Sequence, residues 1–303
     1  MSQLLDILGP ITIITMIGFA MGKSSVGLHA RTLSNLVLMV ATPSLVFHTL
    51  VSMHIGFATM GQMALAAMLV ITLAGALGLV GLWAVGQPIR SFLPSLMMPN
   101  SGNMGLPLAA LAFGEEGMRL GVSYFFIVAL IQYSVGFSIA SGSLHLSRLL
   151  RQPLIYAVGL VLIVTALDVP VPAMILKTTE MLGGMMIPSM LILLGSSLAT
   201  LGVSELRSAF AVAFGRLGLG VVSGLAIIWA LGLDGIAAGV VFILATMPSA
   251  IVTFVFAERF SPDAGRVAGG VVVSTVMTFL CLPLLIWGAL ALAGGDLSGP
   301  GRP

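Results

Sequence analysis

The sequence predicts an all-α integral membrane protein of ten transmembrane helices, arranged as two five-helix repeats of opposite topology with one interrupted helix in each. Three observations lead to this fold class. The chain is 58% hydrophobic and only 7% charged, with a mean hydropathy of +1.16, whereas about a quarter of the residues in soluble domains are charged. Apolar runs long enough to span a bilayer recur along the chain. Proline landmarks also repeat between its two halves.

The length fits about ten spans, because 303 residues at roughly 20 per span leave only short connections. We therefore expect one transmembrane domain over residues 1–303, with repeat one at 1–143 and repeat two at 153–295. The first apolar run has no basic residue before Lys23, so it is interpreted as a span and not as a cleaved signal. The ten expected spans are Leu4–Met21, Leu33–Val51, Met60–Val85, Ser91–Phe113, Met118–Ile139, Pro153–Leu167, Ile175–Leu198, Ala209–Leu231, Ile236–Ala257 and Val267–Ala293.

The internal repeat rests on two landmarks that occur in the same order in both halves. Laying one half on the other superimposes Pro43-Ser44 of the second span on Pro188-Ser189 of the seventh. Nearly the same shift superimposes Met98-Pro99 on Met247-Pro248. Because five is an odd number of spans, the second copy enters the membrane from the opposite side, which predicts an inverted repeat.

The basic residues predict the orientation. In the ten-span arrangement, nine of the twelve Lys and Arg residues fall on one side or just inside it, and that side is expected to face the cytoplasm. Both termini then lie outside. The nine are Lys23, Arg31, Arg90, Arg148, Arg151, Arg207, Arg216, Arg259 and Arg266, and the other three are Arg119, Lys177 and Arg302.

The fourth span is interrupted at Pro99–Pro107, which reads PNSGNMGLP. Its prolines remove backbone donors and its glycines loosen the chain. An unpaired backbone group at membrane depth costs several kcal/mol, so such a break persists only when it is buried in protein or lines a wet cavity. The ninth span has a comparable break at Met247-Pro248-Ser249. Broken helices in corresponding places of two halves are typical of the binding site of a transporter.

The ends of the broken helices predict what binds there. The two N-terminal ends, expected near Pro107 and near Pro248-Ser249, each carry roughly half a positive charge and favour an anion. The C-terminal ends, near Met98 and Thr246, leave carbonyls free and favour a cation such as sodium or a water-borne proton. The candidate substrate-binding residues are Asn100, Ser101, Asn103, Ser249, Thr253, Ser44 and Gln132.

Two residues are candidates for the coupling ion, Thr246 and Glu180, and the second has an alternative. Glu180 is the one acid expected inside a span, but it also fits a place near the outer headgroups with Lys177 close by. Arg216 has alternatives too. It meets a substrate carboxylate, or it snorkels to the cytoplasmic surface from about two turns inside the membrane.

The stretch NSGNMGLPLAALAFGEEG at Asn100–Gly117 resembles the signature of the auxin efflux carrier family, and MPSAIVTFVFAERF at Met247–Phe260 is similar to that family's second broken helix. The early LSNLVLMVATPSLVF resembles its second span. The resemblance implies a crossover fold like that of sodium/proton antiporters, usually dimeric, that transports organic anions, with Asn100 at the substrate carboxylate. The long central hydrophilic loop of the plant carriers is missing, so auxin is not the obvious substrate.

The function expected from these features is a secondary active or facilitative carrier of small organic acids, such as malate, malonate or auxin-like carboxylates, in the bacterial cytoplasmic membrane. Its expected partners are the lipid bilayer, a carboxylate, a proton or sodium as coupling ion, and a second copy in a homodimer. No catalytic residue, cofactor, metal or nucleic acid is expected. The alternatives are a cation/proton antiporter, a carrier like the bile-acid/sodium symporters, and a non-transporting receptor.

Overall fold

The structure is a computed structural model that describes residues 2–24, 29–52, 57–143, 153–167, 169–200 and 205–294. Over these residues all regular structure is helical, with one isolated bridged pair of residues and no strand. The loop expected between the repeats lies mostly in residues 144–152, outside the described part. The α-helices are α1 (Ser2–Lys23), α2 (Ala30–Leu36), α3 (Thr42–Ser52), α4 (Phe57–Ala84), α5 (Ile89–Met97), α6 (Leu106–Ile131), α7 (Phe137–Ser141), α8 (Pro153–Ala166), α9 (Ala173–Gly184), α10 (Met186–Thr200), α11 (Leu206–Ala230), α12 (Gly235–Thr246), α13 (Ile251–Phe260) and α14 (Ala264–Leu292), with π-helical turns η1 (Val37–Ala41), η2 (Ser101–Gly105) and η3 (Gln132–Gly136).

The helices have the length and composition of membrane spans. Six stretches are long and apolar enough to cross a bilayer, and shorter apolar helices accompany them, among the residues that the structure describes. Large apolar side chains also cover the outside, including Trp83 and Trp229 near the ends of α4 and α11. A helix that is apolar all round is expected in a bilayer, and tryptophan favours its interfaces. The expected all-helical membrane protein is confirmed.

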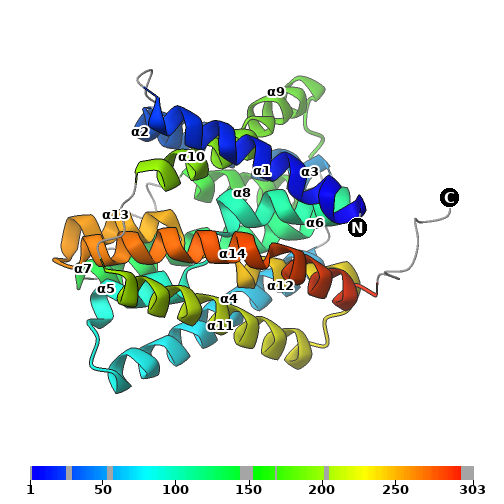
Figure 1. The fold of residues 1–303 in the computed structure, drawn as a ribbon. Helices are drawn as coiled ribbons and strands as arrows, with labels where there is room; N and C mark the ends of the chain where they lie inside the picture. The colour runs from blue at the N-terminus through cyan, green and yellow to red at the C-terminus, as the bar shows by residue number, and fades with distance from the viewer. Residues whose placement is uncertain are drawn as a thin grey trace.

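Two groups of helices can be followed in Figure 1. One contains α1, α3, α8, α9 and α10, and the other contains α4, α5, α11, α12, α13 and α14. In the first group α1 and α10 lie very close, since a Cβ atom on Gly18 or Gly195 would overlap the backbone of the opposite helix. Small residues allow this approach between membrane helices, which associate by close packing. In the second group α11 packs on both α12 and α14.

The fourth span is broken, but over a shorter segment than expected. Only Met98–Asn100 is unwound, because the chain resumes as the π turn η2 and then as α6. The expectation that the second half begins near Pro107 is therefore wrong. Asn100 begins it instead, since its carbonyl accepts the N–H groups of Met104 and Gly105, and Pro107 lies inside the resumed helix.

The ninth span breaks where expected. Helix α12 ends at Thr246, Met247–Ala250 is unwound, and α13 starts at Ile251. A different departure occurs at Gly114, where the connection expected between the fourth and fifth spans is a sharp turn within α6. Gly114 has a φ of +63°, a backbone conformation that glycine adopts without a Cβ clash.

Candidate substrate site at the crossing of the broken helices

The two unwound segments lie against each other. Pro99 and Ser249 form an antiparallel bridge. The Asn100 N–H donates to the Pro248 carbonyl at 2.7 Å, and the Ala250 N–H donates to the Met98 carbonyl at 3.0 Å. Backbone groups that lose their helical partners at the breaks are thus paired across the crossing. A break buried in protein requires such pairing.

Serine and threonine hydroxyl groups form hydrogen bonds around the second break. The Ser249 hydroxyl donates to the Ser95 carbonyl at 2.8 Å, and its N–H donates to Ser274 Oγ at 3.2 Å. The Thr253 hydroxyl donates to the Ala250 carbonyl at 2.7 Å and accepts a hydrogen bond from Ser95 Oγ at 3.0 Å. All four side chains are buried. The polar groups at the start of α13 therefore bond mainly to the protein itself.

The first break is different, because two of its polar side chains have atoms without partners. Asn100 is 4% exposed and Ser101 is 1% exposed, and neither Asn100 Nδ2 nor Ser101 Oγ has a hydrogen-bond partner among the described residues. A buried donor left unpaired costs about 1–3 kcal/mol. Both residues lie where η2 begins, and the first N–H groups of a helix have no partner within it. These donors and the positive helix end together make the start of η2 the candidate site for a carboxylate.

Asn103 is the third polar side chain of this segment. Its side chain is partly exposed, one turn along η2 from Asn100. The η2 segment packs against α10, so it lies where the two groups of helices meet.

Arg216 contacts the ends of α5 and α12, and the alternative in which its side chain snorkels to the cytoplasmic surface is wrong. The side chain is 1% exposed, and its guanidinium points inward. Nε donates to the Met247 carbonyl at 3.0 Å, Nη1 donates to the Leu96 carbonyl at 2.9 Å, and Nη2 donates to the Ala245 carbonyl. The C-terminal carbonyls of α5 and α12 therefore bind a cation supplied by α11.

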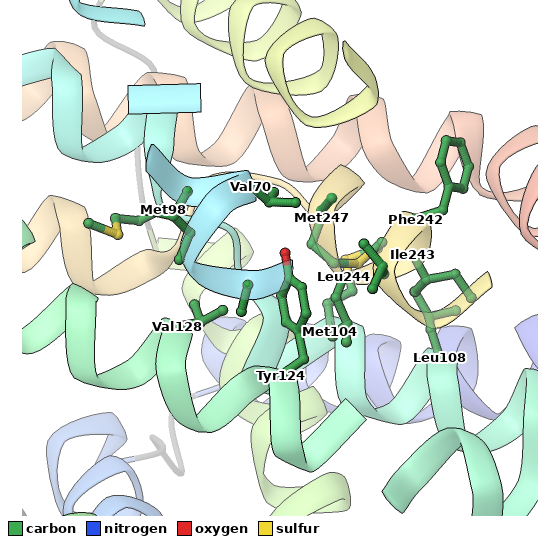
Figure 2. Packing of buried hydrophobic residues seen from close by; sticks show 14 of the residues in the cluster. Val70, Met98, Met104, Leu108, Tyr124, Val128, Phe242, Ile243, Leu244 and Met247 are labelled. Carbon is green, nitrogen blue, oxygen red and sulfur yellow. The ribbon is translucent and has the colours of Figure 1, made fainter. Parts of the chain in front are cut away.

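Tyr124 is a further polar group that the sequence analysis did not single out. Figure 2 shows it on α6 with its hydroxyl directed toward Val70 and Met247. The side chain is fully buried, and the hydroxyl has no hydrogen-bond partner among the described residues. A phenol within an aliphatic cluster carried no sequence signal, whereas Arg216 did, since a charge inside an apolar run marks a functional position.

The other expected site residues lie at varying distances from the crossing. Gln132 is half-buried in η3, a π turn whose Gly136 lies against the Met98 side chain. Ser44 is half-buried on α3, which contacts α6. The apolar side chains of α3 belong to a different cluster from those of Met98 and Met247 at the crossing. The Thr246 hydroxyl donates to the Phe242 carbonyl of its own helix at 2.8 Å, and Glu180 is exposed on α9.

Comparison with known proteins finds a transporter family model that matches part of this chain, and two similar transporters. Residues 137–287 match the model of a membrane transport protein family, a region that includes the second broken helix but not the first. An uncharacterized transporter of Methanothermobacter thermautotrophicus is 28% identical over 84% of this chain and 87% of its own length. An uncharacterized transporter of Methanocaldococcus jannaschii is 24% identical over 87% of this chain and 90% of its own.

These matches and the buried crossing define a multi-pass membrane transporter, and not an enzyme. Residues 137–287 form a membrane transport domain of the auxin efflux carrier family, so the resemblance found in the sequence is confirmed for that region. The described residues hold no group of three His, Cys, Asp or Glu side chains that could bind a metal ion.

Proposed function

We propose that this transporter carries small organic acid anions of the malate, malonate and auxin-like type by alternating access, with the substrate carboxylate bound at the start of η2. The observation that carries the proposal is a pair of polar atoms at a buried helix N-terminus, Asn100 Nδ2 and Ser101 Oγ, for which the described residues supply no hydrogen-bond partner. A carboxylate accepts several hydrogen bonds and is attracted by the helix dipole, so one ligand group would satisfy both features.

The proposed architecture is ten spans in an inverted repeat of five and five, with both termini outside. It is supported by the two breaks, which occur in corresponding helices and meet in antiparallel fashion. It is also supported by Trp83 and Trp229, which lie near the ends of corresponding helices, α4 and α11. We also propose that the protein lies in the cytoplasmic membrane and forms a homodimer. The further substrate-binding residues that we propose are Ser44, Asn103, Gln132, Ser249 and Thr253.

The orientation is testable with single cysteines at the two ends of the ninth span, in a background where Cys281 is replaced by alanine. Asp234 precedes α12, Glu258 lies near the end of α13, and both are exposed. We expect Asp234→Cys to react with an impermeant thiol reagent added to intact cells, and Glu258→Cys to react only after permeabilisation. The opposite labelling would reverse the proposed topology.

The substrate class is testable by a thermal-shift screen of the purified protein against mono- and dicarboxylates, with the matching amides as uncharged controls. We expect at least one carboxylate, and no amide, to raise the Tm and to be taken up by proteoliposomes. The screen is run in sodium chloride and in choline chloride. Proton or sodium flux without any carboxylate response would favour the antiporter instead. That alternative has less support, because an arginine and not a carboxylate occupies the cation-binding side of the crossing.

A further inference from the structure

Arg216 stands out as a full charge in the interior of an apolar helix, buried away from both water and headgroups. Burying an unpaired charge in such an environment is very costly, so its partners define its role. Its hydrogen-bond partners among the described residues are backbone carbonyls: Leu96 near the end of α5, and Ala245 and Met247 at the end of α12. One guanidinium thus joins both broken helices.

The charges balance at this point. The C-terminal end of a helix carries about half a negative charge, so two converging ends amount to about one. The guanidinium supplies one positive charge, and its planar fork of donors reaches several acceptors at once, which a lysine ammonium does not do in the same geometry. In the sequence these ends were the expected place for a coupling cation.

We infer that Arg216 is the built-in cation of this carrier: it occupies the carbonyl ends of both broken helices, holds them in register, and takes the place of an external coupling ion there. Arg216 is in this sense a positioning residue, because it acts on the substrate site through the backbone of the crossing. The inference deepens the proposed function and rests on it only where substrate binding is concerned.

The first test is the thermal stability of the full-length protein in detergent, which needs no substrate. We expect the wild-type Tm to be the same in sodium chloride and in choline chloride of equal ionic strength. Arg216→Ala should lower the Tm by several degrees, and low millimolar guanidinium chloride should raise it again, far below denaturing concentrations. Arg207→Ala is the matched control, since it removes the same charge from an exposed position on the same helix. That control should keep the wild-type Tm and ignore guanidinium.

Arg216→Lys keeps the positive charge but removes the planar set of guanidinium N–H donors, so it tests the two contributions separately. We expect a Tm below that of the wild type, with Arg207→Lys unchanged, and this comparison carries the test if Arg216→Ala does not yield folded protein. A wild-type Tm in Arg216→Lys, a Tm of Arg216→Ala that guanidinium does not raise, or a sodium-specific rise in the wild-type Tm would each overturn the inference.

The second test links Arg216 to the substrate site, with malate as the probe. We expect malate to shift the Tm of Arg216→Ala only when guanidinium is present, and to shift the wild type without it. A malate shift in Arg216→Ala that is independent of guanidinium would overturn the positioning role. If malate fails to bind even the wild type, the proposed substrate is at fault, and the stability comparison still decides the role of Arg216.

Discussion

Asn100→Ala is expected to weaken binding of the carboxylate substrate by roughly tenfold to a hundredfold without lowering the stability of the protein. The loss in affinity follows because a hydrogen bond to a charged group is worth about 1.5–3 kcal/mol. Stability should stay level or rise, because the substitution removes a buried amide nitrogen that has no hydrogen-bond partner in the described part of the chain. Substrate titrations and Tm values on the same purified samples measure both effects.

Three variants sharpen this prediction. Asn100→Asp should bind more weakly than Asn100→Ala, because a carboxylate there repels the anion. Ser249→Ala should have a smaller effect on affinity, since its hydroxyl already donates to Ser95. Asn35→Ala removes the same side chain from an exposed position on α2 and should change neither quantity. Wild-type affinity in both Asn100 variants would remove the first break from the binding site.

The combination of weaker binding and undiminished stability separates a ligand site from a packing kink. A kink stabilised by its own polar side chains loses stability when they are removed, as expected for Ser249 and Thr253, which are bonded within the protein. Asn100 and Ser101 behave oppositely if their partner is a ligand. The asymmetry between the two breaks therefore predicts different roles for the polar residues that follow Pro99 and Pro248.

The presence of the breaks was predictable from the sequence, because proline and glycine within an apolar run leave few other structures open. Their extent was not. The start of the helix at Asn100 depends on the π turn at Ser101–Gly105, where Gly102 and Gly105 lie so close to Phe125 and Leu244 that a Cβ atom at either position would overlap them. Local propensity had favoured Pro107 as the first helical residue.

The inward direction of the Arg216 side chain also could not be predicted from the sequence. Distance from the cytoplasmic end was compatible with snorkelling, and only the three-dimensional arrangement brings the ends of α5 and α12 within reach of one side chain. Glycine at position 220 contributes to this. A Cβ atom there would overlap the Ala245 carbonyl, to which Arg216 donates, so the absence of a side chain lets α11 approach the break.

Gly220→Ala is accordingly expected to destabilise the protein strongly, although it adds a single methyl group. The helices must separate to relieve the overlap with Ala245, which costs about 1–3 kcal/mol for overpacking. The separation also weakens a buried hydrogen bond from a charged group, whose loss costs about 1.5–3 kcal/mol. Gly218→Ala is the matched control on the same helix, because a Cβ atom there would meet no described atom within 4 Å apart from its own stretch of helix.

The two alanines gain the same helix propensity, up to about 1 kcal/mol, so the difference between them isolates the contact with the break. We expect Gly218→Ala to keep or raise the Tm and Gly220→Ala to lower it sharply, measured by thermal unfolding in detergent. Guanidinium should not restore Gly220→Ala, since Arg216 is still present and only its distance from the carbonyl has changed. Equal Tm values for the two variants would mean that α11 can move away from the crossing at little cost, and that Arg216 does not hold the broken helices together.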